Sequence, residues 1–247
     1  MKKIYVIVVL LVLIFSFSAC TKKEKIATKE QIAEFIDIYN SAIDGESFSY
    51  KFEYKFNEKW VTKNRKYVSN LKMNGIVTYN DEELWPNISY KYDGVYNKKT
   101  ITPTSIGKNV KKEKIKESVV RIDTGNAADV EFYINSTVKI KDENGKSLNK
   151  IKTSNSDYME LSVVTLDSIT YDITNLDNYF FVDGNKYKIV INESYFIKEY
   201  MVVLDGDKIK SIEYTMEERH YTKHLKIKFI DYQEIERPKN ASDYENE

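Results

Sequence analysis

The hydrophobic positions of the chain have a helical spacing near its start. The apolar residues of this stretch are Ile32, Phe35, Ile36, Tyr39 and Ile43. They recur every three or four residues, which is typical of an amphipathic helix. Thr28 and Gln31 have the spacing of a capping box, and Gly45 is a helix-stop residue. The pattern therefore predicts a helix that begins after Thr28 and ends before Gly45.

Directly after this helix the period changes from 3.6 to 2, because aromatic residues alternate with polar ones. The aromatic residues, named here the aromatic stripe, are Phe48, Tyr50, Phe52, Tyr54 and Phe56. A strand directs alternate side chains to opposite faces, so all five rings share one face. We expect this face to pack under the helix as core. The alternative is that the rings, together with Phe35 and Tyr39, line an apolar cavity for a lipid or other hydrophobic ligand.

Strand-like alternation continues along much of the remaining chain. The predicted strands lie at 71–79, 88–96, 118–123, 129–141, 187–191, 200–204, 209–216 and 225–232, with turns at 142–145, 183–184 and 205–206. Two segments stay open. Residues 100–117 carry many lysines and could be a loop or a short helix, and residues 157–178 have apolar residues at both spacings.

These elements predict a single α+β domain. Its expected architecture is a curved, mostly antiparallel sheet packed on the N-terminal amphipathic helix, and an unclosed β-barrel is one form that such a sheet can take. No Pro/Gly-rich linker or fixed-period repeat divides the chain. We expect a signal peptide at 1–19, a spacer at 20–27, the domain at 28–238 and a disordered polar tail at 239–247.

The N-terminal segment has the features of an export signal. Lys2 and Lys3 precede an unbroken apolar run, Ile4–Phe15, which is too short to span a membrane as a helix. Phe17-Ser18-Ala19-Cys20 resembles the lipobox of bacterial lipoproteins, and Cys20 is the single cysteine of the chain. This resemblance implies that Cys20 carries a lipid that anchors the protein to the membrane without a spanning helix.

Composition excludes several classes of function. Lys+Arg and Asp+Glu are 38 each, so the chain lacks the basic excess of a nucleic-acid-binding protein. The eight glycines are too far apart for a dinucleotide-binding loop or a nucleophile elbow. His220 and His224 have helical metal-ligand spacing, but their surroundings favour a strand or its turn. We therefore predict no catalytic residues, no metal and no cofactor, and hence no enzyme.

The lysines of the open segment have two interpretations. They are Lys108, Lys111, Lys112, Lys114 and Lys116. Such a run is typical of a solvated face, and the alternative is contact with a membrane or a polyanion.

The lipobox, the helix that leads into an aromatic strand, the antiparallel meanders and the last strand before Pro238 together resemble the LolA/LppX-type lipid-carrier lipoproteins. This resemblance implies an unclosed β-barrel around a cavity that carries acyl chains. The expected function is therefore that of an extracytoplasmic lipoprotein that binds a hydrophobic ligand. The alternative is a surface module that docks a protein or wall polymer through Tyr-rich strands. Lysine far outnumbers arginine, and Asn, Ile and Tyr are abundant, which is typical of proteins from low-G+C genomes. This favours the outer face of a Gram-positive plasma membrane. In a Gram-negative cell the protein would face the periplasm.

Overall fold

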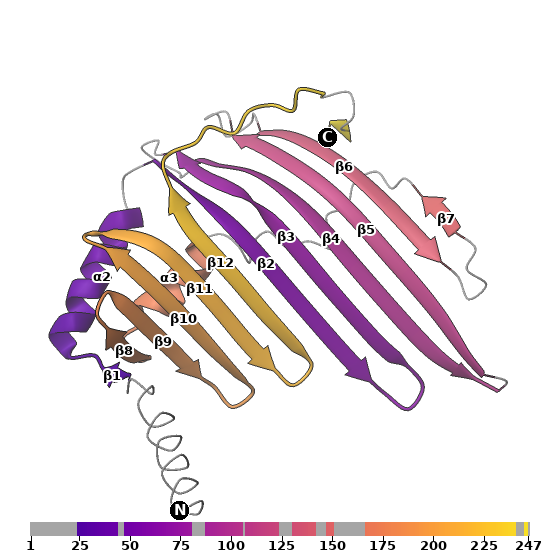
Figure 1. The fold of residues 1–247 in the computed structure, drawn as a ribbon, viewed down its shortest axis with the longest axis horizontal. Coiled ribbons are helices and arrows are strands. Elements are labelled where there is room, and N and C mark those ends of the chain that lie inside the picture. Colours follow the sequence, from indigo (N-terminus) through magenta and orange to yellow (C-terminus); the bar gives the residue numbers. More distant parts are fainter. Residues whose placement is uncertain are drawn as a thin grey trace, which may run out of the picture.

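The structure is a computed structural model that describes residues 24–43, 47–80, 87–105, 107–123, 130–141, 147–150, 166–240 and 245–246. Two helices and thirteen strands are described in these ranges (Figure 1). The helices are α2 (Lys29–Ile43) and α3 (Leu166–Thr174). The strands are β1 (Lys25–Ile26), β2 (Phe48–Val61), β3 (Lys66–Asn80), β4 (Asn87–Thr104), β5 (Gly107–Asp123), β6 (Val130–Lys141), β7 (Ser147–Lys150), β8 (Tyr179–Asp183), β9 (Lys186–Asn192), β10 (Phe196–Asp205), β11 (Lys208–Glu218), β12 (Tyr221–Ile230) and β13 (Glu245–Asn246).

All strands belong to one antiparallel sheet in the order β1-β8-β9-β10-β11-β12-β2-β3-β4-β5-β6-β13, and β7 also pairs with β6. β12 pairs with β2, which joins the C-terminal meander to the N-terminal strands. Among the described residues the two end strands, β1 and β13, do not pair with each other. The sheet is therefore open and curved, as Figure 1 shows, and the prediction of a mostly antiparallel sheet is confirmed.

The predicted N-terminal helix forms as α2, and its cap has the predicted geometry. The Thr28 backbone N–H donates to Gln31 Oε1 at 3.0 Å, and the Gln31 backbone N–H donates to Thr28 Oγ1 at 3.3 Å. Two of the donors that every helix start leaves unpaired are satisfied in this way. Phe35 and Tyr39 on the inward side of the helix are fully buried.

The lysine-rich segment 100–117, expected as a loop or short helix, is strand. β4 continues to Thr104 and β5 begins at Gly107, so the segment belongs to a long hairpin. Its few apolar residues did not reveal the period, because here both faces of the sheet carry polar side chains. In the segment left undecided, residues 166–174 form α3, where Leu166, Ile169 and Ile173 are buried at helical spacing, and residues 157–165 lie outside the described ranges.

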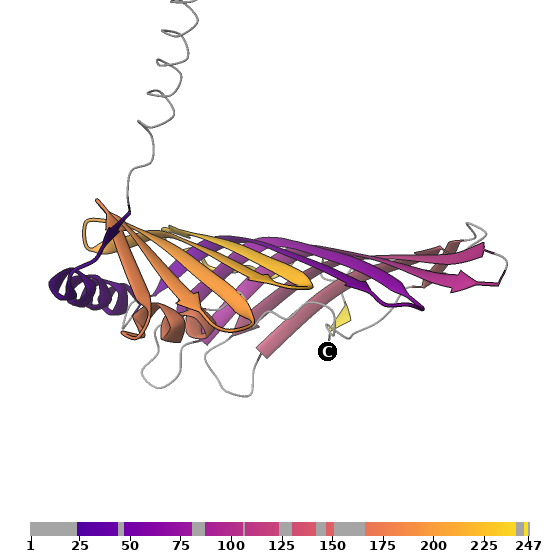
Figure 2. The ribbon, with the colours of Figure 1, turned by 90° about the horizontal axis from the view of Figure 1, so that it is seen from below.

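The sheet has two unlike faces. The inner face carries Tyr50, Phe52 and Tyr54, which belong to the main core together with residues of α2 and α3. Figure 2 shows both helices on one side of the sheet, near β8–β12. The outer face is the opposite face of β12 and β2–β6, and the register row Lys51–Ile76–Lys91–Val120 lies on it.

A second, smaller core lies on the outer face. Residues 231–237, named here the C-terminal strap, follow β12 without regular structure. Ile235 of the strap is 3% exposed and packs with Val120 and Tyr133. The Gln233 backbone N–H donates to Ser49 Oγ at 2.8 Å, and Thr78 Oγ1 donates to the Gln233 carbonyl at 2.6 Å. The strap therefore covers part of the outer face by both apolar and polar contacts.

The tail predicted to be disordered is described at Lys239–Asn240 and at Glu245–Asn246, and the latter pair with Tyr133 and Ile134 of β6 as β13. Cys20 and the predicted signal peptide lie outside the described residues. No helix among the described residues is long and apolar enough to cross a membrane.

Candidate functional site

The aromatic stripe lies where the sequence predicts, on one face of β2. Tyr50, Phe52 and Tyr54 are at most 4% exposed, and Phe48 and Phe56 are half-buried. The rings pack against residues from other elements of the main core. The structure thus brings the predicted site residues together as part of a shared interior.

The contacts around the stripe are those of a packed core. Phe48 stacks on Tyr79 with ring centroids 4.7 Å apart. From the helix, Phe35 stacks on Tyr187 of β9 at 4.5 Å. The Tyr39 hydroxyl lies 3.2 Å from Thr170 Oγ1 of α3, so one of the two hydroxyls donates to the other. Offset stacking at these distances stabilises the interior beyond simple burial.

Within the stripe, Phe52 lies over a glycine of the neighbouring strand. Phe52 and Gly75 are direct register partners in β2 and β3, and Tyr92 is the next partner in β4. A Cβ atom at Gly75 would lie 2.8 Å from Phe52 Cε1 and 2.2 Å from the Lys91 carbonyl oxygen. The missing side chain at Gly75 is therefore what admits the Phe52 ring.

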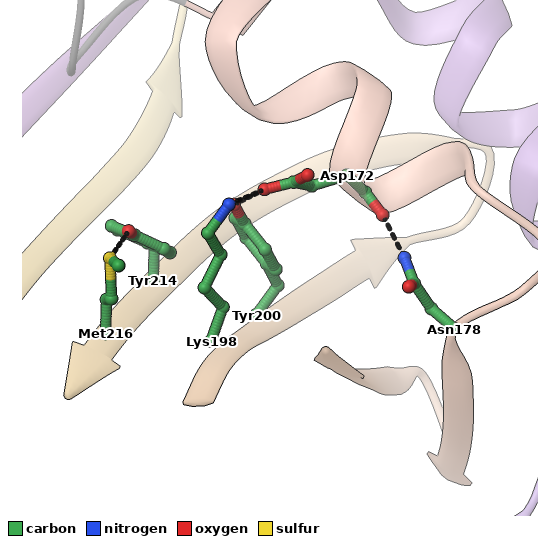
Figure 3. Close-up of polar contacts among 6 residues, drawn as sticks. All are labelled: Asp172, Asn178, Lys198, Tyr200, Tyr214 and Met216. Atoms are coloured by element: carbon green, nitrogen blue, oxygen red, sulfur yellow. Dashed lines mark hydrogen bonds and ion pairs between the residues drawn. The ribbon is translucent and has the colours of Figure 1, made fainter. Parts of the chain in front are cut away.

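A polar cluster, named here the Asp172 cluster, fixes α3 to the inner face of the meander (Figure 3). The Tyr200 hydroxyl donates to Asp172 Oδ2 at 2.5 Å, and Lys198 Nζ lies 3.0 Å from the same oxygen. Asn178 Nδ2 donates to the Asp172 carbonyl at 2.6 Å. Tyr214 stacks on Tyr200 at 4.9 Å. The carboxylate is thus occupied by two donors from β10, an arrangement that docks a helix rather than activates a substrate.

Burial shapes the protonation of this cluster. Desolvation raises the pKa of the Tyr200 hydroxyl well above its usual range, and the hydrogen bond to Asp172 adds to the effect. Desolvation also raises the pKa of Tyr214, with the Asp172 charge as the second cause. Both phenols therefore stay protonated across the physiological range and act as donors.

A second buried polar pair lies on the inner face of β4 and β5. Glu117 is 6% exposed and its register partner in β4 is Gly94. The Tyr92 hydroxyl donates to Glu117 Oε1 at 3.3 Å. Burial raises the pKa of Glu117, and the hydrogen bond from Tyr92 opposes that rise. The carboxyl group can hold a proton, and its register partner in β6 is Ser136. Among the described hydrogen bonds, however, its partner is Tyr92, and no histidine or cation joins it, so the pair does not form a nucleophilic constellation.

The outer face has a cleft of about 590 Å³ across the middle of β12 and β2–β5, named here the outer cleft. Its cationic walls are Lys51, Lys91, Lys226 and Lys228, and its other outer-face residues are Glu53, Asn74, Ile76, Asp93, Ser118 and Val120. The row Phe52–Gly75–Tyr92–Val119 also borders it. Because this row points its side chains inward, its backbone closes the cleft from below. The site is amphipathic: Ile76 and Val120 lie at one end, beside the strap.

A recess of about 470 Å³, named here the lysine recess, lies further along the outer face of β3–β6. It is bordered by Lys99, Lys112, Lys114, Lys139 and Lys141, together with Val68, Asn70 and Asn97. The register pair Lys98 and Glu113, which lies between the two lysine rows and alternates to the other face, also borders it. The sequence indicated Lys112 and Lys114 as part of a basic run but not Lys99, Lys139 or Lys141. The sequence shows lysines at alternate positions within each strand, but it does not show the register that aligns the lysines of neighbouring strands.

The two histidines do not form a shared site. His220 lies in the turn before β12 and stacks on Trp60 at 4.1 Å. His224 lies within β12, where its Nε2 is 2.8 Å from Glu213 Oε1. Within the part of the chain that the structure describes, no group of three or more His, Cys, Asp or Glu could hold a metal ion.

Comparisons with known proteins give little guidance. No family model and no curated protein matches the sequence. Among solved structures, a porin-like protein from Bacteroides uniformis is similar, with a TM-score of 0.19 and 10% sequence identity over 72% of this chain and 96% of that chain. A likeness at this TM-score carries no inference about function.

Proposed function

We propose that this protein is a lipid-anchored extracytoplasmic module that docks a partner, a protein or a wall polymer, on the outer face of its open sheet. One observation carries the proposal. The aromatic stripe is packed against other elements of the core, whereas the clefts of about 590 Å³ and 470 Å³ lie on the outer face. Concave sites with convergent polar groups are where partners bind.

The chemistry of the outer face refines the expected mode of docking. Most strand tyrosines occupy inward positions and are buried, as Tyr50, Tyr92 and Tyr200 are. The exposed large aromatics of the described chain are Trp60, Tyr171, Tyr179, Tyr195 and Tyr232. Because the outer clefts are bordered mainly by lysine and small polar side chains, the docking groups proposed here are these polar groups rather than the tyrosines.

The anchor is tested at Cys20, the cysteine of the lipobox-like sequence. A Cys20→Ala variant should move from the membrane fraction to the soluble fraction of the envelope, because one diacylglyceryl group holds a protein firmly to a bilayer. Intact-mass measurement of the wild-type protein should reveal the added lipid. An unmodified Cys20 in membrane-bound protein would contradict the anchor.

Docking is tested by sedimentation of the Cys20→Ala protein with isolated, lipid-extracted envelope. A Lys51→Glu/Lys226→Glu variant should bind at least about fivefold less, since the change reverses two charges at the outer cleft. The matched control, Lys186→Glu/Lys210→Glu, reverses two exposed lysines on β9 and β11 and should bind as the wild type does. Equal loss in both variants, or no sedimentation of the wild type, would contradict docking on this face.

The second candidate is carriage of a hydrophobic ligand. The observation that favours it is the placement of α2 and α3 on the inner face of an open, curved sheet, which is the arrangement that the LolA/LppX-type resemblance implies. Native mass spectrometry of protein purified without added lipid should then detect a bound lipid in addition to the one on Cys20. Bare polypeptide would rule out carriage and leave docking intact.

A further inference from the structure

The lysine recess is built from lysines that lie directly opposite one another. Lys99 of β4 pairs with Lys112 of β5, and Lys112 pairs with Lys141 of β6. Beside this row, Lys114 pairs with Lys139. Strands lie about 4.8 Å apart, so each row places its lysine side chains beside one another at the spacing of neighbouring strands. All five lysines are exposed.

Such rows are unfavourable for the isolated sheet. Like charges directly opposite each other on neighbouring strands destabilise a sheet, whereas opposite charges stabilise it. The other face of the same hairpin has the favourable arrangement, because Lys98 there pairs with Glu113. The next carboxylate along the outer face of β4 is Asp93, four positions from Asn97, and it accepts a hydrogen bond from Ser118. Within the described residues, neither row therefore has a carboxylate beside it on its own face. Glu113 borders the recess, but its side chain alternates to the other face, where it pairs with Lys98.

The recess also offers neutral polar groups. Asn97 Nδ2 donates to Asn70 Oδ1 at 3.1 Å, so the two amides form one polar surface across β3 and β4. Val68 borders the recess on the same face. A ligand with anionic groups at regular intervals and hydroxyls or ester oxygens between them matches both the ammonium rows and the amides.

We propose that the lysine recess binds a flexible anionic polymer of the phosphate-repeat type. This inference rests on the proposed function and names the chemistry of its partner. The recess is concave, with a volume of about 470 Å³, which suits a segment of a flexible chain better than a planar membrane surface. Binding releases the counterions of the polymer and removes the repulsion within the rows Lys99–Lys112–Lys141 and Lys114–Lys139.

The probe is long-chain inorganic polyphosphate with a fluorescent label, and the readout is anisotropy with the full chain purified in neutral detergent. The test variant is Lys99→Gln/Lys112→Gln/Lys141→Gln. We expect it to bind at least about tenfold more weakly at moderate salt, and we expect its log-log salt slope to fall by about 0.7 for each phosphate that a lysine no longer neutralises. The control, Lys186→Gln/Lys208→Gln/Lys210→Gln, removes the same charge from exposed lysines of β9 and β11 and should change affinity less than about twofold.

Further arms separate the sources of phosphate and guard against misfolding. Pyrophosphate and phosphatidylglycerol bicelles should compete only weakly, because neither presents a flexible chain of phosphates. The test variant should unfold at the same or a higher urea concentration than the wild type, since it removes opposed like charges. A second variant, Lys99→Arg/Lys112→Arg/Lys141→Arg, keeps the charge and should keep the binding.

Several results would overturn the inference. They are no binding of polyphosphate by the wild type, equal weakening in the test and control variants, and stronger competition by the bicelles than by unlabelled polyphosphate. If the wild type binds the envelope but not polyphosphate, this inference alone is contradicted. If the wild type does not bind the envelope at all, the proposed function is contradicted.

Discussion

At Gly75 the sheet has no room for a side chain. A Cβ atom there would lie 2.2 Å from the Lys91 carbonyl oxygen, 2.7 Å from Tyr92 Cβ and 2.8 Å from Phe52 Cε1. Two of these atoms are fixed by the backbone of the neighbouring strand, so the sheet must shift to admit a methyl group. We expect Gly75→Ala to reduce the free energy of unfolding by about 1–3 kcal/mol, as overpacking does elsewhere.

Asn74 provides the matched control for this prediction. It precedes Gly75 in β3, and its exposed side chain lies on the opposite face of the sheet. Asn74→Ala should therefore change the free energy of unfolding by no more than about 0.5 kcal/mol in the same urea titration. If both variants lost stability equally, the close approach of Phe52 to Gly75 would not be the cause.

At the scale of elements, the Asp172 cluster determines how firmly α3 is docked. Asp172→Ala removes the acceptor of the Tyr200 hydroxyl and the partner of Lys198. A buried donor left without a partner costs about 1–3 kcal/mol, so we expect a loss of that size in the free energy of unfolding. Asp177→Ala, at an exposed position just after the helix, should have little effect. Faster amide exchange in α3 of the first variant would locate the loss.

The C-terminal strap is a second element whose contribution can be measured. Ile235 is 3% exposed against Val120 and Tyr133, and Ile→Ala changes at such sites cost about 2–5 kcal/mol. We expect Ile235→Ala to lower the free energy of unfolding by an amount in this range and so to lower the urea midpoint, and Glu236→Ala, which alters an exposed neighbour, to leave the midpoint unchanged. An unaltered midpoint in Ile235→Ala would show that the strap does not stabilise the sheet.

At the scale of the whole molecule, buried tyrosines link stability to alkaline pH. Desolvation raises the pKa values of Tyr92, Tyr96, Tyr200 and Tyr214 above the usual value near 10. The folded protein then holds protons that the unfolded chain releases, so this stabilisation is present below pH about 10 and is lost as the pH rises above it.

The expected outcome is that much of the tyrosinate absorbance at 295 nm develops together with the loss of far-UV circular dichroism. Tyr200→Phe removes one such group and should make stability fall less steeply with pH above about 10. Complete ionisation of the tyrosines in a sheet that keeps its native circular dichroism would contradict burial of these hydroxyls.

How far the sequence predicts the fold differs from element to element. The capping box at Thr28 and Gln31 and the alternation in β2 are local patterns, and both appear in the structure as predicted. The turns at Gly184 and Gly206 also form, with φ of 62° and 65°. The strands of segment 100–117 were not recognised, because their polar composition removed the apolar period on which a strand prediction relies.

The candidate sites depend on the tertiary structure for a different reason. The sequence by itself determined that the rings of Phe48 to Phe56 share one face, because the side-chain period of a strand is two. It could not determine which strands are neighbours. Only the pairing of β12 with β2 and the register of β4, β5 and β6 placed the stripe in the main core and aligned Lys99, Lys112 and Lys141. Register is set by the apolar pattern of the strands and by the turns that join them, and the polar strands of segment 100–117 carried no apolar period from which it could be predicted.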